Sequence, residues 1–375
     1  MARDLVAERL AVEQERERAR IRTPLQLAWR QLTRYKLALA GGAVLIVLYL
    51  VMLFAEFLAP YGLDFSDRTA YYAPPVGVHV VDAQGRWHLP FVYPYRQVDP
   101  SVPTYAEDIS RRFPIHVFVH GFPYRLLGLV PTDIHLAGVD APARLFLLGS
   151  DQFGRDTFSR VLFGSRVSLL IGITVVITTF PIGMLLGGVA GYYGGVVDNI
   201  IMRMVEVLAA FPTFYLTLTL ASVLPPTISG AARLFMITLV FSVVGWGGLA
   251  RVIRGIVLSL RDLEYVLAAR AAGLTDLRVI IRHVLPGTSS YLIVAATLTI
   301  PGAILGESGL SFLGIGVQEP STSWGLQLAQ AQSIDVLTQF PWLLIPGLFI
   351  VVAIIAYNFL GDGIRDALDP RQRSR

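Results

Sequence analysis

The sequence predicts an all-α, polytopic membrane protein with six transmembrane helices and a small β-rich insert outside the membrane. Three observations support this fold class. Of the 375 residues, 54% are hydrophobic and 15% are charged, well below the roughly 25% of charged residues in soluble domains. Six windows hold about the 20 apolar residues that a helix needs to cross a bilayer. Between the first two windows lies a long segment without helical periodicity.

The chain therefore divides into five parts. We predict a cytoplasmic N-terminal segment, a first transmembrane helix, an extracytoplasmic insert, a core with five further transmembrane helices, and a cytoplasmic tail, at residues 1–36, 37–59, 60–150, 151–361 and 362–375. The five apolar windows of the core lie near 167–190, 200–224, 234–258, 288–306 and 341–361.

The N-terminal segment is too long and too acidic to be the charged region of a signal peptide, so we interpret the first window as an uncleaved span. Ahead of it, Thr23 can cap a helix and Pro24 suits the first helical position. Helical spacing of apolar residues follows at Leu25, Ala28, Trp29 and Leu32. This part is either a helix on the inner membrane surface or an extension of the first span.

The insert is rich in Pro, Tyr and Val. Residues 77–90 predict two short strands around a DAQG turn, and residues 114–128 predict another hairpin. Five of the six histidines lie in this insert, at His79, His88, His116, His120 and His135. Imidazole is a common metal ligand, but these residues show no zinc-like spacing. Scattered strand histidines are favoured over a metal site.

The core windows hold glycines four residues apart, at Gly183, Gly187 and Gly191. This spacing is typical of membrane helices that pack closely, and a role in lining a substrate path is the alternative. Charges are rare near the spans. Asp198, Arg203 and Glu206 lie around the start of the third, as an ion-pair cluster at the membrane surface or as a proton relay.

Arginines indicate the orientation of the chain in the membrane. They gather in residues 1–36, 251–287 and 362–375. Six spans place all three regions on one side, and the positive-inside rule makes that side cytoplasmic. The sequence thus predicts a multi-pass protein of the inner or plasma membrane with both termini in the cytoplasm. The net charge of +4 fits this arrangement, so we expect no nucleic-acid partner.

Several kinds of chemistry lack their residues. The chain has no cysteine, and Lys36 is its only lysine, without the glycine-rich motif of a P-loop around it. The chain therefore does not hydrolyse ATP through a P-loop of its own. HExxH and GxSxG motifs are absent, and His283 is the only histidine outside the insert. We predict no catalytic residue, no metal ligand and no bound cofactor, and hence a non-catalytic membrane subunit.

The charged stretch at 264–287, EYVLAARAAGLTDLRVIIRHVLPG, lies between two apolar windows. It predicts two short helices. The first stops at Gly273, and Thr275 caps the second, with Asp276 in its first turn. In the first helix, Glu264, Ala268 and Ala272 share a face of small side chains that a partner protein can approach.

In the second helix, we expect an apolar stripe, with the charged residues opposite and Pro286 ending the element. The stripe consists of Leu277, Ile280, Ile281, Val284 and Leu285, opposite Arg278 and Arg282. An ordinary cytoplasmic loop with solvated arginines is the alternative to a docking surface.

This stretch resembles the EAA loop of permeases from ATP-binding-cassette (ABC) importers: EAA, three residues, Gly, nine residues, a hydrophobic residue, one residue, then Leu-Pro. Leu267 and His283 depart from that pattern, where the family has Glu and Ile, and Glu264 lies one turn before the first departure. The resemblance implies ATPase coupling through Glu264, Ala268, Ala269, Gly273, Arg278, Arg282, Leu285 and Pro286.

Four further blocks are similar to the C-type permeases of dipeptide and oligopeptide (peptide/nickel) importers. They are LLGSDQFGRDTFSRVLFGSRVSLLIG, GYYGGVVDNIIMRMVEVLAAFPTF, GESGLSFLGIGVQEPSTSWG and GDGIRDALDPR, at 147–172, 191–214, 306–325 and 361–371. The resemblance implies the type I ABC importer permease fold, with the 260–287 region as the coupling loop.

The resemblance also implies partners for the chain in the lipid bilayer. These are a second homologous permease in a heterodimer, two ABC ATPases that bind ATP and Mg²⁺, and an extracytoplasmic solute-binding protein. Dipeptides, oligopeptides, nickel chelates, glutathione and oligosaccharides all remain possible cargoes. A stand-alone secondary transporter or channel is the alternative function.

Overall fold

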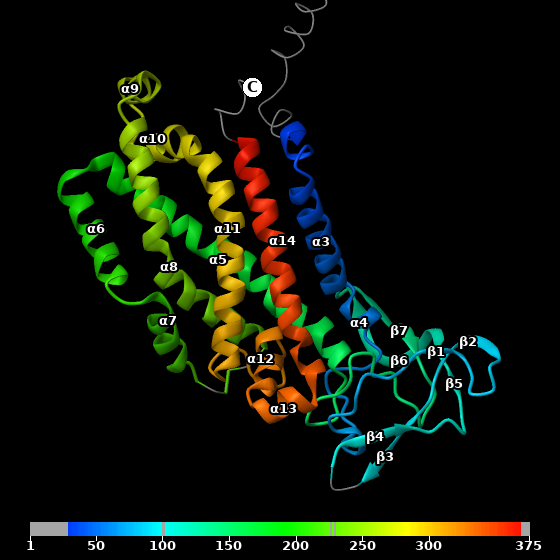
Figure 1. The fold of residues 1–375 in the computed structure, drawn as a ribbon. Helices are drawn as coiled ribbons and strands as arrows, with labels where there is room; N and C mark the ends of the chain where they lie inside the picture. Colours follow the sequence, from blue (N-terminus) through cyan, green and yellow to red (C-terminus); the bar gives the residue numbers. More distant parts are fainter. Residues whose placement is uncertain (1–28, 100–101, 226, 229, 369–375) are drawn as a thin grey trace, which may run out of the picture.

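The computed structural model describes residues 29–99, 102–225, 227–228 and 230–368. It shows a bundle of long helices with the strands gathered beyond one end (Figure 1). In this part of the chain, five helical runs are long and apolar enough to cross a membrane. They are α3 (Lys36–Leu53), α5 (Thr157–Tyr193), α8 (Gly230–Leu260), a run that ends in α11 (Ser289–Phe312) and a run that ends in α14 (Ile345–Leu368).

The window at 200–224 does not form one straight helix. It is divided between α6 (Gly195–Ala209) and α7 (Thr213–Ser222), which bend by 84° and make a sixth span only if counted together. The break lies at Pro212, whose backbone is extended. Proline has no N–H to donate and disfavours the helical conformation in the residue before it, so the helix ends there. Pro181 and Pro301, by contrast, lie inside continuous helices.

The ends of the chain are described in part. The predicted surface helix begins at Thr23, and its residues as far as 28 lie outside the described residues. The predicted cytoplasmic tail begins as helix, because α14 continues to Leu368, and residues 369–375 lie outside the description.

The stripe of glycines brings α5 against α8, the helix pair with the most extensive contact. A Cβ atom at Gly187 would collide with the carbonyl oxygen of Ala250, and one at Gly191 would lie 2.7 Å from the carbonyl oxygen of Arg254. At Gly183 it would lie 2.8 Å from Leu249 Cδ2. The close-packing interpretation of the spacing is confirmed at these three positions, since only glycine permits this approach.

The strands form three small sheets within residues 79–138. Strands β1 (His79–Val81), β2 (Trp87–Val92) and β5 (Phe113–Pro114) make one antiparallel sheet. Hairpins pair β3 (Tyr95–Asp99) with β4 (Thr104–Glu107) and β6 (His116–Leu126) with β7 (Val130–Gly138). The predicted hairpin at 114–128 is wrong, because Gly121 and Pro123 coincide with a register shift rather than a turn. One long strand results, and it turns at 127–129.

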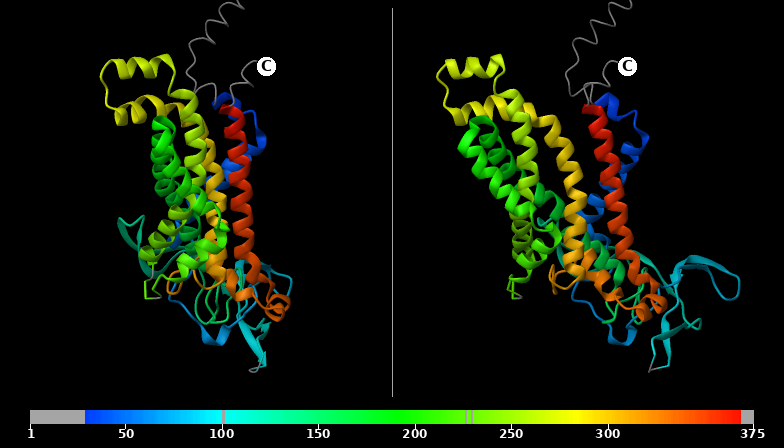
Figure 2. Two further views of the ribbon diagram at one scale, coloured as in Figure 1. Left: turned by 90° about the vertical axis from the view of Figure 1, so that its left-hand side faces the viewer. Right: turned by 60° about the vertical axis from the view of Figure 1, so that its left-hand side comes forward.

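Short helices close the end of the bundle that faces the strands (Figures 1 and 2). These are α4 (Ala55–Leu58), η1 (Arg68–Ala70), α12 (Trp324–Leu328), η4 (Ala329–Ala331), α13 (Ile334–Gln339) and η5 (Pro341–Leu344). Trp324 is fully buried, and its indole N–H donates to the carbonyl oxygen of Val161 at 3.0 Å. Two segments far apart in the sequence are thereby joined at the start of α5.

Candidate functional site

The 264–287 segment lies at the end of the bundle opposite the strands (Figures 1 and 2). It consists of α9 (Glu264–Ala271), a turn, α10 (Asp276–Val279), a π-helical turn η2 (Ile280–Val284) and a 3₁₀ turn η3 (Leu285–Thr288) that leads into α11. The α9 helix projects beyond the ends of the long helices. Its outer surface is therefore open to another protein.

The predicted face of small side chains on α9 is exposed. Glu264, Ala268 and Ala272 are all on the surface, and Leu267 beside them is 46% exposed. Ala269, one of the coupling residues that the resemblance implies, is instead buried against the bundle. One residue along a helix is a rotation of about 100°, which carries the side chain of Ala269 from the outer face to the inner one. Ala268 and Ala269 therefore have different environments.

Gly273 ends α9 as predicted. Its φ is +80°, and the N–H groups of Gly273 and Leu274 donate to the carbonyl oxygens of Arg270 and Ala269 at 2.9 and 3.3 Å. This pair of bonds is the Schellman motif, which favours glycine because a side chain strains the left-handed conformation. Thr275 holds the N-cap position of α10, but its side chain makes no capping hydrogen bond there.

Three of the five residues in the predicted apolar stripe of the second helix are buried. Ile280, Val284 and Leu285 are buried, whereas Leu277 and Ile281 are 54% and 52% exposed. A fourth buried residue, Val279, directly precedes Ile280 and was not part of the predicted stripe. The π-helical turn widens the helix at Ile280–Val284, so an even 3.6-residue spacing no longer predicts which side chains point inward.

The two arginines of the second helix are exposed, as predicted. Within the described part of the chain, no hydrogen bond or ion pair is formed by Arg278 or Arg282. Pro286 does not end the element as expected, because the helix continues through it into α11. It lies in the first turn of η3, where a missing N–H costs little.

A polar link joins the 264–287 segment to the end of α5. The hydroxyl of Tyr192 donates to Asp276 Oδ1 at 2.8 Å, and Arg270 Nε donates to the same hydroxyl at 3.0 Å. The Arg270 guanidinium also lies 4.4 Å from the centre of the Tyr192 ring. One tyrosine of α5 therefore contacts both helices of the segment, and the sequence gives no local signal for this pairing.

An apolar cluster continues the link into the bundle. Val266 and Ala269 of α9 and Val279, Val284 and Leu285 beyond the turn share it with residues of the long helices, namely Phe180, Tyr192, Leu249, Ile253 and Val257. Each fully buried valine or leucine contributes about 1.5–3 kcal/mol to stability. The inner face of the segment is therefore held firmly against α5 and α8, while its outer face remains open.

Asp198, Arg203 and Glu206 do not form one cluster. Asp198 accepts hydrogen bonds from the Nε and Nη2 atoms of Arg254 in α8, while Arg203 Nη1 lies 2.8 Å from Glu206 Oε2 on the surface of α6. Asp198 thus pairs with a residue that lies 56 positions away in the sequence, and spacing along the chain does not reveal this partner.

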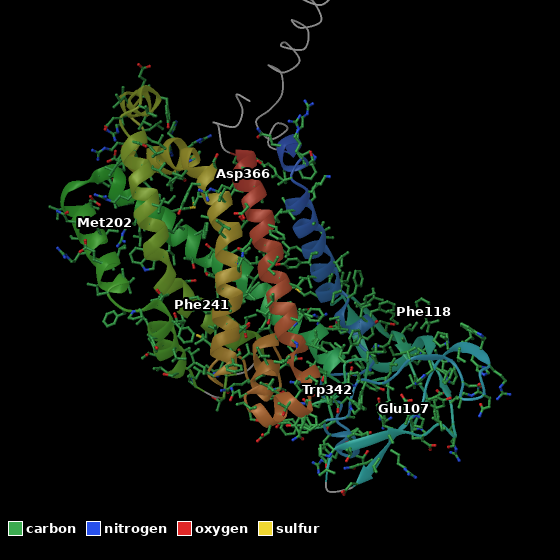
Figure 3. All side chains as sticks on the ribbon, in the orientation of Figure 1. Glu107, Phe118, Met202, Phe241, Trp342 and Asp366 are labelled. Carbon is green, nitrogen blue, oxygen red and sulfur yellow. The ribbon has the colours of Figure 1, made fainter. Side chains whose placement is uncertain are left out.

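A cavity of about 370 Å³ lies among α5, α7, α8 and α11. Threonine hydroxyls and aromatic rings line much of it, including Thr179, Thr213, Thr217, Thr299, Phe241 and Tyr291. Figure 3 shows Phe241 on α8 within the bundle. No aspartate, glutamate, lysine or arginine of the described residues lines this space. Its surface can contact apolar groups and donate or accept neutral hydrogen bonds.

Two of the quoted sequence blocks meet beside the strands. Arg155 Nη1 and Arg160 Nη2 both donate to Glu319 Oε1, at 2.9 and 2.8 Å. The Ser168 hydroxyl, also from the first block, donates at 3.4 Å to Glu307, whose side chain is fully buried. No local pattern in the sequence predicts these contacts, and the charged residues and serines of the two blocks are the only signal of them.

The histidines of the insert each have a separate environment. Four lie near one carboxylate apiece, in the pairs His79–Glu107, His88–Asp82, His116–Asp140 and His120–Asp133. His135 is buried, and its two ring nitrogens face the carbonyl oxygens of Glu56 and Phe122 at 2.8 and 3.0 Å. Among the described residues, no three His, Asp or Glu side chains come together in a way that could hold a metal ion.

Comparison with known proteins gives two family matches. Residues 183–374 match the model of binding-protein-dependent transport system inner membrane components, which covers just over half of the chain. Residues 23–75 match the N-terminal transmembrane domain of oligopeptide transport permease C.

Individual relatives agree with these matches. The chain is 32% identical to the dipeptide transport system permease protein of Bacillus subtilis (strain 168) over 96% of its own length and 91% of that protein. It is 40% identical to the oligopeptide transport system permease protein of Haemophilus influenzae over 60% and 70% of the two chains. The glutathione transport system permease protein of Pectobacterium atrosepticum is 32% identical over 94% and 93%. Among solved structures, an inward-facing MetNI methionine ABC transporter is similar, with 19% identity, a TM-score of 0.41, and coverage of 56% and 94%.

Proposed function

Because this chain belongs to the family of binding-protein-dependent transport system inner membrane components, we propose that it is a permease subunit of an ATP-driven importer of peptides. Relatives named for dipeptide, oligopeptide and glutathione transport support this substrate class. Both termini lie in the cytoplasm, and so does the 264–287 segment. The strands lie on the opposite, extracytoplasmic side, where substrate arrives.

The observation that carries the proposal is the construction of the 264–287 segment. Its outer face presents Glu264, Ala268 and Ala272, and its inner face is packed against α5 and α8. A partner that binds the outer face and changes shape will therefore displace both long helices. A partner changes the conformation of the bundle only if it binds two arrangements with different affinity, and this surface is where such a difference can act.

The proposed partners follow from the two ends of the bundle. Two ABC ATPases bind ATP and Mg²⁺, and one of them docks on α9 and the exposed Arg278 and Arg282. A second homologous permease completes the membrane part as a heterodimer. An extracytoplasmic solute-binding protein delivers the peptide on the side of the strands, where the 60–150 insert contacts it or the second permease.

The cavity among α5, α7, α8 and α11 contributes to the substrate path. Its hydroxyls bond to peptide groups, and its aromatic rings contact apolar side chains. Because no charged side chain lines it among the described residues, it accepts peptides of different sequence. Selection among them therefore belongs to the binding protein.

Uptake of a labelled dipeptide into proteoliposomes tests the proposal. The complex of both permeases and both ATPases, supplied with the binding protein, should accumulate the dipeptide with ATP and not with ADP. Uptake by this chain alone, driven by an ion gradient and independent of ATP, would establish a secondary transporter or channel instead. Mass spectrometry of the ligand that co-purifies with the binding protein identifies the cargo.

A further inference from the structure

An exposed ion pair lies on the surface of α6. Arg203 Nη1 and Glu206 Oε2 are 2.8 Å apart, and the two side chains are 80% and 56% exposed. The α6 helix forms part of the broken span and lies at the edge of the bundle, where Figure 3 labels Met202. Charged side chains of membrane helices face protein or water rather than acyl chains. The surface around this pair is therefore not covered by lipid alone.

The orientation of α6 about its own axis is fixed by its opposite side. Ile201 and Val205 are buried against Ala190 of α5 and Trp246 of α8. Asp198, one turn before Ile201, is held by the guanidinium of Arg254. A rotation of α6 that buried Arg203 and Glu206 would break the contact between Asp198 and Arg254. It would also expose the apolar side chains on the opposite side of the helix. The ion pair thus stays on the outer surface of this chain.

An apolar groove lies beside the ion pair. It is formed by Arg203, Met204, Val207 and Leu208 of α6 and by Val243 and Trp246 of α8, and it encloses about 370 Å³. Met204 and Val207 are 54% and 55% exposed, and Ile200 is 58% exposed. If water covered this face, its apolar side chains would be exposed to solvent. If acyl chains covered it, the ion pair would lie in lipid. A protein helix with apolar side chains and a polar group satisfies both requirements.

We propose that the α6 face, defined by Ile200, Arg203, Met204, Glu206 and Val207, is the surface on which a transmembrane helix of the second permease packs. Apolar side chains of that helix enter the groove beside Trp246. A polar or charged group on the same helix meets the Arg203–Glu206 pair. This inference rests on the proposed function, because it assumes a second permease, and it adds the place of contact and the chemistry of the partner helix.

Site-specific photo-crosslinking tests the position of this contact. The two permeases are co-expressed with their ATPases, and the photoreactive p-benzoylphenylalanine replaces Met204 in one sample. In the control sample it replaces Ile46, a 63% exposed residue of α3. Residues 37–55 around this position contain no charged side chain. We expect an adduct with the second permease from Met204 that is at least about tenfold more abundant than from Ile46.

The outcomes separate this inference from the proposed function. If the native permeases co-purify but Met204 gives no permease adduct, or no more than Ile46, the α6 face is not the interface while the proposed function stands. If no second permease co-purifies with the native chain, both ideas fail. The chain has no cysteine, so Ile200→Cys can also be labelled in the assembled complex. Rapid labelling by a membrane-impermeant maleimide would show an aqueous surface and overturn the interface.

Exchange of charge tests the ion pair. Arg203→Glu places two carboxylates together, and we expect the yield of co-purified second permease to fall at least about fivefold. Arg203→Lys keeps the positive charge and should retain most of the yield. Equal yields from the two variants and from the native chain would overturn the role of the charges.

Discussion

Tyr192, near the end of α5, donates a hydrogen bond of 2.8 Å to Asp276 at the start of α10, across 84 residues of sequence. The same hydroxyl accepts a bond from Arg270 in α9. Two short helices at the end of the bundle opposite the strands are therefore joined to the longest helix of the bundle by one side chain. In the proposed importer, this contact passes the movement of an ATPase to the substrate path.

Tyr192→Phe removes the hydroxyl and leaves the ring in place. Asp276 and Arg270 each lose a hydrogen bond, and a typical net loss is about 1 kcal/mol per bond. We expect ATP hydrolysis by the assembled complex to continue while peptide uptake per ATP falls about three- to tenfold. The control is Tyr215→Phe, at a 67% exposed position of α7. Unchanged uptake per ATP in Tyr192→Phe would contradict a role of this contact in coupling.

Gly187→Ala tests the close approach of α5 and α8. The added Cβ would collide with the carbonyl oxygen of Ala250, so the helices must separate, and overpacking typically costs about 1–3 kcal/mol. Gly248→Ala is the matched control, because no atom lies within 4 Å of its added Cβ and alanine favours a helix. We expect a lower melting temperature in detergent for Gly187→Ala and an equal or higher one for Gly248→Ala. The reverse order would refute the packing argument.

Gly273→Ala isolates backbone strain at the end of α9. No atom lies within 4 Å of the added Cβ, so the cost arises from the φ of +80° and is about 1–2 kcal/mol. Asparagine tolerates this conformation better than alanine. The stability of α9 in Gly273→Asn should therefore lie between that of the native protein and that of Gly273→Ala. Amide hydrogen exchange at α9 measures the loss of protection. Equal exchange in all three proteins would mean that the turn does not depend on glycine.

These positions also show what the sequence could and could not predict. Local spacing predicts the turn at Gly273 and the packing of Gly187, because each depends on a few adjacent residues or one helix face. The burial of Ala269 and the exposure of Ile281 were missed, because the orientation of α9 and the π-helical turn are set by α5 and α8. The partners Tyr192–Asp276 and Asp198–Arg254 are distant along the chain, and no single-sequence pattern joins them.

Asp82 makes the stability of the insert depend on pH. Its burial opposes ionisation, but hydrogen bonds from the Arg86 N–H, the His88 ring and the Gln84 N–H outweigh burial and hold the pKa of its carboxyl below the usual range. Since the folded pKa is depressed, the carboxylate stabilises the insert above its unfolded pKa near 3.8. That stability is lost as the pH falls further, through the folded pKa.

Asp82→Asn should therefore weaken exchange protection of β1 and β2 in the full chain at neutral pH, where the native carboxylate is ionised. The difference from the native protein should shrink below about pH 4, where the native carboxylate begins to lose this contribution. Asp133→Asn, at a half-exposed carboxylate paired with His120, is the control and should have a smaller effect. A difference that stays constant down to pH 3 would contradict the assignment.

The central claim is that the outer face of α9 receives an ATPase. Ala268→Arg changes that face at an exposed position, and Ser259→Arg places the same side chain at an exposed position at the end of α8. Ala269 is unsuitable for this test, because its burial makes any large substitution disturb the segment itself. The direct measurement is the amount of ATPase that co-purifies with the permeases from membranes. We predict that Ala268→Arg lowers it at least about tenfold while Ser259→Arg retains it. Full ATPase recovery with Ala268→Arg, together with native uptake, would contradict the account.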